Sequence, residues 1–325
     1  MRWDISAKKW REINEPVQWP DQYIHHALIQ VLEPVMMRGM DPYCCGSIRG
    51  RGAAKARKAI QFWVRKDRRR TKYELCGDIR HFYDSLEPAR VCQRMKCLVK
   101  DRRVLDLIER VTADGVKIGA YTSQWLANTF LQPLDNLIRQ SGYCKYYVRY
   151  MDNLTIFGPN KRKLKKLRLL IEEWLNANGL ELKGNWQIFR TSIRLPDAVG
   201  YRFGNTYTLP RKGSLLRLKR ALAKYEKKNG RVSVREAQGL LSRLSILAHA
   251  SNHNLYKRLL KGRKIQRALK QIVKEKEAVT WNMYLARRER MKRSGRKETT
   301  TRRSKASARS SGSTRTRQSP THFAS

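Results

Sequence analysis

The sequence predicts an α+β fold, in which helices cover one face of an antiparallel sheet. Up to about residue 210, short β-prone apolar runs alternate with segments in which apolar residues recur at helical spacing. One such run, residues 146–157, contains a short acidic turn between two apolar halves and therefore predicts a β-hairpin. Beyond residue 210 the strand-like runs stop and basic amphipathic segments follow, so a separate helical part is expected there.

The first elements expected are two helices joined by a Gly/Arg loop. Apolar residues at helical spacing predict a helix over residues 21–39, and residues 53–66 predict a second one. The glycines between them let the backbone approach a ligand closely, and Arg49 and Arg51 supply charge there. A loop of this composition is also common as a plain basic turn, so the pattern alone assigns it no function.

Two carboxylates are expected at strand ends. Residues 73–86 form a strand-like run in which Asp78 lies where the apolar part ends, and the hairpin of residues 146–157 carries Asp152 at its tip. A turn aspartate alone is common on a surface hairpin. Two strand-end carboxylates brought together, however, form a site for hard divalent cations, and two such ions clamp the attacking and leaving oxygens of a phosphoryl transfer.

The remaining elements follow from periodicity and capping signals. Helices are expected over residues 87–112, 122–140 and 161–178, the last ending at Gly179, and strands over residues 180–189 and 199–203. Three basic helices are expected after residue 210: residues 214–225, a helix from the capping box Ser233–Glu236 to Ala250, and residues 254–273.

The composition points to a polyanionic partner. The chain of 325 residues has 71 Lys and Arg against 27 Asp and Glu, and its formal net charge of +44 would destabilise a compact fold unless a partner neutralised it. Phosphate contacts would then dominate binding and make it salt-sensitive. A ribosomal or generic RNA-binding protein is also basic, but it rarely combines this charge with carboxylates at strand ends.

The cysteines and the N-terminal residues bear on the compartment. Six cysteines show no C-x-x-C spacing of a zinc site, and scattered thiols suit a reducing cell interior. No apolar run follows the first charges, which argues against a signal peptide, and no membrane span is visible. We therefore expect a cytoplasmic protein.

Three motifs resemble those of reverse transcriptases. The segment Asp78-Ile-Arg-His-Phe-Tyr-Asp-Ser-Leu86 resembles the first carboxylate motif of that family, and Tyr150-Met-Asp-Asn153 resembles its Tyr-x-Asp-Asp box. Residues 114–124 lie between them, where the family has its template and nucleotide loop. The motifs cover residues 73–158 in the family's order, and weaker likeness extends from about residue 10 to residue 260.

The resemblance implies a right-hand polymerase with fingers and palm followed by a helical thumb. It would have an N-terminal extension over residues 1–20, fingers and palm over residues 21–209, the thumb over residues 210–291, and a disordered basic tail over residues 292–325. The activity implied is that of an RNA-directed DNA polymerase, a nucleotidyltransferase that uses dNTPs and a primer to copy template RNA into cDNA.

The family's roles carry over to matching positions. Asp78 and Asp152 would hold two Mg²⁺ ions, with Mn²⁺ as an alternative, and the backbone carbonyl of Ile79 is the further ligand implied. Tyr83 would select deoxynucleotides by blocking a ribose 2′-hydroxyl, although a core aromatic fits the same pattern. Lys183 would donate a proton to the leaving pyrophosphate, unless it is a solvated strand lysine. The nucleotide-binding residues implied are Arg49, Arg51, Tyr83, Ile118, Gly119, Gln124 and Lys183.

Asn153 is the main departure from the family pattern. It completes the catalytic set implied by the resemblance, but the family has a second aspartate at this position. An amide offers a neutral oxygen and gives a cation less charge than a carboxylate does. Either the site binds metal more weakly, or the chain is a catalytically impaired relative that retains RNA binding. Some viral RNA polymerases with Asp-Asn at this tip are active, which favours the first reading.

The loop Ile118-Gly-Ala-Tyr-Thr-Ser-Gln124 carries information on the subfamily. It resembles the reverse transcriptases of diversity-generating retroelements, which implies a bacterial or phage-encoded, error-prone enzyme that works with a small basic accessory protein. Most other relatives place Pro-Gln before the glycine, and an apolar Ile118 would remove a polar check on the base pair. The alternatives are a phage-defence enzyme and another prokaryotic reverse transcriptase.

Overall fold

The computed structural model describes residues 2–4, 9–11, 13, 15–251, 257, 259, 264–276 and 283. The chain divides into two compact units, one formed by Met1–Leu216 with Ile246–His253 and the other by Arg217–Ser245 with Asn254–Ser325. Within the first unit lie both carboxylate segments, so the site is built from that unit alone.

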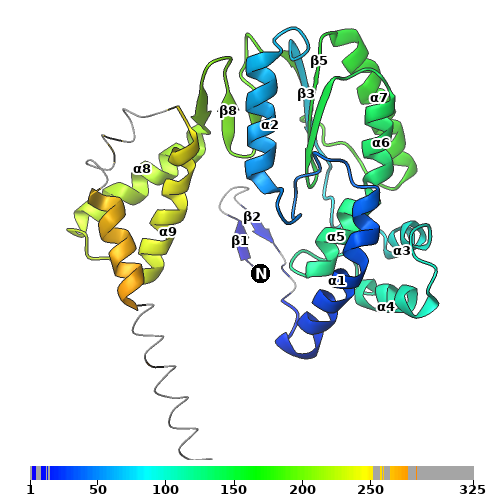
Figure 1. Ribbon diagram of the computed structural model, residues 1–325, viewed down its shortest axis with the longest axis horizontal. Helices are drawn as coiled ribbons and strands as arrows, with labels where there is room; N and C mark the ends of the chain where they lie inside the picture. The colour runs from blue at the N-terminus through cyan, green and yellow to red at the C-terminus, as the bar shows by residue number, and fades with distance from the viewer. Residues whose placement is uncertain are drawn as a thin grey trace, which may run out of the picture. The chain divides into compact units, whose positions relative to one another are not determined.

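A four-stranded antiparallel sheet forms the centre of the first unit. Its strand order is β4-β5-β3-β6, and its strands are β3 (Tyr73–Asp78), β4 (Tyr146–Tyr150), β5 (Asn153–Gly158) and β6 (Gln187–Arg190). The register of β3 and β5 pairs Tyr73 with Gly158 and Asp78 with Asn153. The C-terminal end of β3 therefore lies beside the turn of the β4–β5 hairpin (Figure 1).

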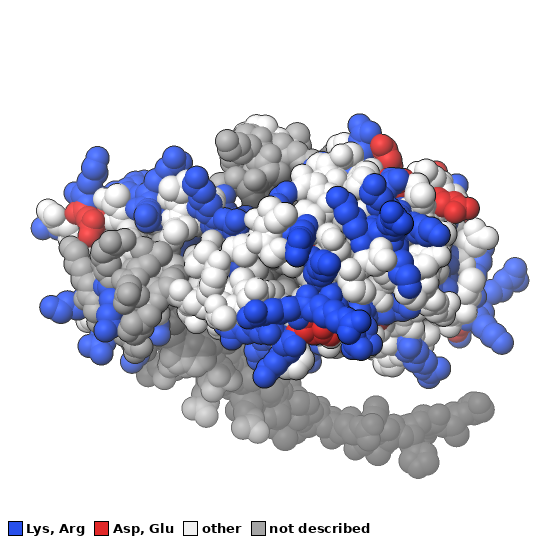
Figure 2. Space-filling view, turned by 90° about the horizontal axis from the view of Figure 1, so that it is seen from above, with Lys and Arg blue, Asp and Glu red and all other residues white. Residues whose placement is uncertain are grey.

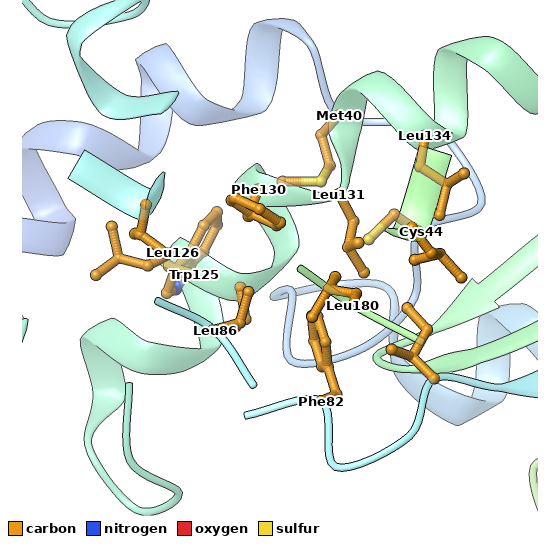
Figure 3. Packing of buried hydrophobic residues seen from close by; sticks show 14 of the residues in the cluster. Met40, Cys44, Phe82, Leu86, Trp125, Leu126, Phe130, Leu131, Leu134 and Leu180 are labelled. Atoms are coloured by element: carbon orange, nitrogen blue, oxygen red, sulfur yellow. The ribbon is translucent and has the colours of Figure 1, made fainter. Parts of the chain in front are cut away.

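One face of the sheet packs on a large helical layer. Leu75 and Ile156 from the sheet and Trp125 from a helix belong to one buried cluster, part of which Figure 3 shows from close by. Its helices are α1 (Tyr23–Arg38), α3 (Pro88–Lys96), α4 (Arg102–Thr112), α5 (Tyr121–Phe130), α6 (Gln132–Gln140) and α7 (Lys161–Ala177). Burial of this apolar face is the main favourable contribution to folding of the unit.

The other face of the sheet is also covered. Val148 and Phe157 pack in a second buried cluster with Trp63 of α2 (Gly52–Lys66) and with Phe203. A three-stranded sheet completes this layer, with strands β7 (Asp197–Ala198), β8 (Tyr201–Phe203) and β9 (Thr208–Pro210). Because side chains alternate along a strand, Glu74, Cys76 and Asp78 all project from this face.

The α+β fold predicted from the sequence is confirmed, with differences in detail. The helix expected over residues 87–112 is two helices, because Asp101 caps the second one and its side chain accepts a hydrogen bond from the Arg103 N–H at 2.9 Å. The helix expected over residues 122–140 breaks before Pro133. The strand expected over residues 180–189 is shorter, because residues 183–186 form a turn closed by a hydrogen bond from the Trp186 N–H to the Lys183 carbonyl.

The N-terminal residues and the second unit contain further short elements. The N-terminal ones are β1 (Arg2–Asp4), paired with β2 (Lys9–Arg11), and the π-helical turn η1 (Gln18–Gln22). Helix α8 (Lys212–Lys227) leads into the second unit, which contains α9 (Val234–Leu244), and the 3-10 turn η2 (Ser245–His249) follows. The predicted capping box at Ser233 is present.

Two predicted segments lie partly or wholly outside the described residues. Of the helix expected over residues 254–273, the described part from residue 264 onward is helical and continues to residue 276. The tail expected over residues 292–325 lies outside the described residues. Within the described part, no helix combines the length and apolar character that a membrane crossing requires.

Candidate active site

The structure brings Asp78 and Asp152 together at one end of the central sheet. Asp78 is the last residue of β3 and is paired in register with Asn153, the first residue of β5. The Ile79 N–H donates a hydrogen bond of 3.1 Å to the backbone carbonyl of Asp152. Both aspartates are half-buried, so their carboxylates are held by the sheet while remaining accessible from solvent.

The hairpin tip is a tight turn of two residues, Met151 and Asp152. Tyr150 pairs with Asn153 on the other side of the turn, and Met151 has a positive φ of 56°. A non-glycine residue in this left-handed region costs on the order of 1 kcal/mol and needs support from its surroundings. Part of the support comes from the tip itself, where the Asn153 side-chain N–H donates to Asp152 Oδ1 at 2.9 Å.

A buried polar network supports the tip from below. Arg149 is fully buried and donates through Nε and Nη2 to the two carboxylate oxygens of Asp135, at 2.8 and 2.7 Å. Arg149 Nη1 donates to Asn128 Oδ1 at 2.9 Å and to the Met151 carbonyl at 3.2 Å. Burial alone would lower the pKa of Arg149, but the Asp135 carboxylate outweighs it and holds the pKa above its usual range. The guanidinium therefore remains charged directly beneath the tip.

The same network anchors the loop before α2. The Cys45 N–H donates to the Arg149 carbonyl at 2.8 Å, and Asn128 Nδ2 donates to the Gly46 carbonyl at 2.8 Å. A Cβ on Gly46 would lie 2.6 Å from the Met151 backbone nitrogen, so only glycine allows this approach. The sequence patterns did not predict this network. The available signal was a pair of polar residues, Asn128 and Asp135, seven positions apart within a helical pattern dominated by apolar residues.

A cavity of about 450 Å³ lies beside the carboxylates, between the central sheet and the three-stranded sheet. Asp78, Tyr150 and Asn153 line one part of it, and Asp197 and Arg211 line another. Arg211 and Asp197 form an ion pair with a separation of 2.7 Å. The cavity therefore extends from the ends of β3 and β5 to the charged side chains of Asp197 and Arg211.

The family follows from a match to a family model. The model described as "Reverse transcriptase (RNA-dependent DNA polymerase)" matches residues 6–189, which is more than half of the chain and includes both carboxylate motifs. The chain belongs to the reverse transcriptase family. The predicted enzyme class, an RNA-directed DNA polymerase and hence a nucleotidyltransferase, is the class that this family defines.

Three solved structures similar to this reverse transcriptase are telomerases of Candida species. Telomerase of Candida albicans in complex with a fragment of telomeric RNA has 12% identity and a TM-score of 0.47, with 78% of this chain and 47% of that chain covered. Apo telomerase of Candida tropicalis has 9% identity and a TM-score of 0.46, with 78% of this chain and 54% of that chain covered. Its form without the C-terminal domain has 13% identity and a TM-score of 0.43, with 59% of this chain and 45% of that chain covered. The chain thus spans about half the length of these proteins. The search of curated proteins finds no match.

The structure distinguishes the two arginines of the Gly/Arg loop in this reverse transcriptase. Arg51 Nη1 donates to the carbonyls of Asp41 and Cys44, at 2.6 and 3.2 Å, so its guanidinium closes its own loop. Arg49 is exposed. Arg49 is therefore the better placed of the two to reach a ligand.

Tyr83 and Lys183 lie next to the carboxylates. Burial and then the charge of Asp152 raise the pKa of Tyr83, and Arg149 opposes them, so Tyr83 titrates under the influence of charges at the hairpin. The Lys183 N–H donates to the Asp78 carbonyl at 2.8 Å, while its side chain is exposed. Both residues therefore lie in the part of the fold that contains Asp78 and Asp152.

The loop before α5 is less directly connected to the carboxylates. Ile118 is half-buried and Gly119 has a positive φ of 119°. Gln124 precedes Asn128 by four residues on α5 and so shares the helix face whose Asn128 reaches the hairpin. Among the described contacts, none joins Ile118 or Gly119 to Asp78 or Asp152.

The donor set at the tip fits hard divalent cations. The described residues contain no group of three or more His, Cys, Asp or Glu that could hold a metal, so Asp78 and Asp152 must be supplemented by other oxygens. The Ile79 N–H bonds to the Asp152 carbonyl, which holds the backbone of Ile79 beside the hairpin tip and makes its carbonyl a candidate further ligand. Members of the reverse transcriptase family generally use divalent metal ions, and these residues fit them.

Proposed function

We propose that this chain copies an RNA template into cDNA by nucleotidyl transfer at Asp78 and Asp152. The observation that carries the proposal is the register of the central sheet, which pairs Asp78 with Asn153 and so sets the two aspartates side by side. The basic composition supports a nucleic-acid substrate, because phosphate contacts need many cations.

Each residue of the site has a distinct part in this proposal. Two Mg²⁺ ions, when bound, would activate the primer 3′-oxygen and neutralise the pyrophosphate. Asp78, Asp152 and the Ile79 carbonyl would hold these ions, and Asn153 orients the Asp152 carboxylate through its hydrogen bond. Arg49, exposed on its loop, contacts the triphosphate of the incoming nucleotide.

Selection and proton transfer fall to the residues beside the carboxylates. The Tyr83 ring, half-buried near Asp152, excludes a ribose 2′-hydroxyl and so selects deoxynucleotides. Lys183 is anchored to Asp78 through its backbone and donates a proton to the leaving pyrophosphate. Gln124 and the loop at Gly119 approach the nucleotide and its template base.

The test is extension of a DNA primer on an RNA template in Mg²⁺ and, separately, in Mn²⁺. Asp78→Ala and Asp152→Ala should each reduce extension by about a thousandfold or more, since each removes a charged ligand from the reacting centre. Asp84→Ala is the matched control, because Asp84 is an exposed carboxylate in the same motif. Extension by either site variant at the control's rate would overturn the assignment. A wild type that binds RNA but extends with neither metal is an RNA-binding relative instead.

The finer proposal is an error-prone enzyme of a diversity-generating retroelement, working with a small basic accessory protein. It is supported by the apolar Ile118 before Gly119, where most relatives have glutamine. Ile118→Gln restores a polar group, and one hydrogen bond of discrimination is worth about 1–3 kcal/mol, or roughly tenfold to a hundredfold in error rate. Sequencing cDNA from wild type and variant on one template decides it. Rare adenine-opposite errors in the wild type, or equal errors in both, would favour a phage-defence or other prokaryotic reverse transcriptase.

A further inference from the structure

The end of the central sheet opposite to Asp78 carries a concentration of positive charge. Tyr73 begins β3 and pairs with Gly158, the last residue of β5. Five strand steps separate Tyr73 from Asp78, which is about 17 Å at the usual rise per residue. Side chains at this end are therefore too far from the carboxylates to contact the reacting nucleotide.

Three basic segments meet at this end. Residues 68–72 contain four exposed Lys or Arg and lead into β3; exposed Lys145 precedes β4; and residues 161–163 are three exposed cations that follow β5. We call the cations of these three segments the distal basic surface. Figure 2 looks onto this end and shows Lys and Arg side chains gathered there, with few acidic ones among them.

The distal basic surface stands on a rigid base. The Tyr146 hydroxyl donates to Asp67 Oδ2 at 2.8 Å, which ties the start of β4 to the segment before residue 68. The Lys145 N–H donates to the Phe157 carbonyl at 2.9 Å, which ties Lys145 to the end of β5. The segments before β3 and β4 and the end of β5 are therefore tied to one another through the sheet.

The charges of this surface are poorly compensated by the protein itself. Asp67 is the neighbouring acid, and hydrogen bonds from Tyr146 and the Arg70 N–H, which outweigh a desolvation cost, lower its pKa, so it stays ionised but already has partners. The first turn of α7 contains no acidic residue, although Lys161 and Arg162 stand at the positive end of its helix dipole. A cation at a helix N-terminus is unfavourable, because it faces the positive end of the helix dipole. A bound polyanion would neutralise the uncompensated cations and also the repulsion between Lys161, Arg162 and the helix dipole.

We propose that the distal basic surface binds the phosphate backbone of a folded, base-paired part of the RNA, apart from the strand being copied. Arginine guanidinium groups match phosphate oxygens in bidentate geometry, and the surface contains Arg68, Arg69 and Arg162. RNA is favoured over an acidic protein because RNA is the partner already proposed for the catalytic end, and the inference rests on that proposal for its choice of ligand. The enzyme would thus hold its template RNA at two separate places.

The test uses the full chain and a labelled, fully paired RNA hairpin without a primer. The variant Arg68→Gln/Arg69→Gln/Lys161→Gln/Arg162→Gln removes four exposed cations of the surface. The control Lys96→Gln/Lys100→Gln/Arg102→Gln/Arg110→Gln removes the same charge from exposed positions on and beside α3 and α4. Each lost phosphate contact makes the dependence of log affinity on log salt shallower by about one. We expect the surface variant to lose two to four such units and the control variant fewer than one.

Primer extension on a short, unstructured RNA template separates this proposal from the catalytic one. The surface variant should extend within about threefold of wild type, because the surface lies about 17 Å from the carboxylates. Equal hairpin binding and equal salt dependence in the two variants would overturn the proposal, whatever the extension assay gives. Binding to poly-glutamate, a model for an acidic protein, is measured in parallel. If the surface variant loses binding to poly-glutamate but retains binding to the RNA hairpin, the proposal is overturned and an acidic protein is identified as the partner.

Discussion

Arg149 and Asp135 form an ion pair of 2.7 Å in which both side chains are completely buried. Arg149 also donates to the carbonyl of Met151, the residue of the β4–β5 turn whose backbone is in the left-handed region. A buried ion pair is weak evidence for stability, because desolvation offsets its attraction. Its contact with the hairpin suggests that this pair positions the neighbouring Asp152.

The first prediction separates stability from positioning in this pair. Arg149→Met leaves the Asp135 carboxylate buried and unpaired, so it should lower the free energy of unfolding by about 3–5 kcal/mol. The double variant Arg149→Met/Asp135→Leu removes the buried charge and should regain part of that stability, although the buried Tyr147 hydroxyl loses its acceptor. It should still extend primers poorly, because the Met151 carbonyl has lost its donor. Urea denaturation and primer extension on the same preparations measure the two effects.

The exposed ion pair of Arg80 and Glu181 supplies the stability control, since its side chains are 55% and 59% exposed. Glu181→Gln should cost less than about 1 kcal/mol. Full recovery of extension in the Arg149→Met/Asp135→Leu variant would show that the pair serves stability alone.

The second prediction concerns Gly46, which packs against the hairpin tip. In Gly46→Ala the new Cβ would lie 2.6 Å from the Met151 nitrogen and would also meet the Met151 sulfur. Because a backbone atom is involved, the tip must move, and a misplacement of about 1 Å can cost up to a hundredfold in rate. We expect primer extension to fall at least tenfold, with Asp78 still in place.

Two variants sharpen this test. A Cβ on Gly184 meets no atom within 4 Å, so Gly184→Ala should leave extension unchanged. Trimming the sulfur in Gly46→Ala/Met151→Ala should not restore the rate, because the clash with the backbone nitrogen remains. Restoration would mean that the side chain, rather than the position of the tip, limits the single variant.

Local patterns predict the carboxylates of this site but not their support. Asp78 and Asp152 are visible in the sequence because each stands at the end of an apolar run, and strand ends determine where their side chains go. The Arg149–Asp135 pair is not visible, because an arginine inside a β-prone run looks like an exposed residue until its partner across the core is known. Only the three-dimensional packing of α6 against the hairpin brings the two together.

The covering of the second sheet face shows the same limit. Periodicity predicts α2 as a helix, but it does not say against which face of which sheet the helix packs. Burial of Glu74 follows from that placement, since its neighbours in register, Phe157 and Phe189, lie on the face that α2 and the three-stranded sheet close. In the sequence, Glu74 is indistinguishable from an exposed strand residue.

The third prediction follows from the burial of Glu74. Its side chain is 0% exposed, and neither carboxylate oxygen has a hydrogen-bond partner among the described residues. Burial, reinforced by the charge of Asp197 and opposed by Arg194, raises its pKa from 4.5 to about 8. The folded protein therefore holds a proton there that the unfolded chain releases above pH 4.5. This proton contributes stability that is complete below pH 4.5 and is lost as pH rises to about 8.

Urea denaturation across this pH range tests the prediction. Relative to wild type, Glu74→Gln should become steadily more stable as pH rises, by at most about 1.4 kcal/mol per pH unit, because Gln has no proton to lose. Glu173→Gln, at an exposed position of α7, should keep the wild-type pH dependence. Parallel curves for wild type and Glu74→Gln would show that Glu74 is ionised in the folded protein.

The fourth prediction concerns the departure from the family pattern at Asn153. Its amide donates to Asp152 Oδ1 at 2.9 Å and thereby occupies one of the two carboxylate oxygens of Asp152. Asn153→Asp removes this donor and adds a full charge at the tip. Mg²⁺ demands near-ideal oxygen geometry and gives up water reluctantly, whereas Mn²⁺ accepts varied ligands, so the added carboxylate should help Mg²⁺ more.

We expect Asn153→Asp to raise primer extension in Mg²⁺ by about tenfold, equivalent to roughly 1.4 kcal/mol, and in Mn²⁺ by less. Asn153→Ala removes the hydrogen bond without adding charge, so it separates the two contributions. If the alanine variant gains as much as the aspartate variant, then release of the Asp152 oxygen is the cause. If Asn153→Asp loses activity in Mg²⁺ while Asn153→Ala does not, repulsion between the adjacent carboxylates outweighs the gain, and the surroundings of the tip, including Arg149, are adapted to the amide.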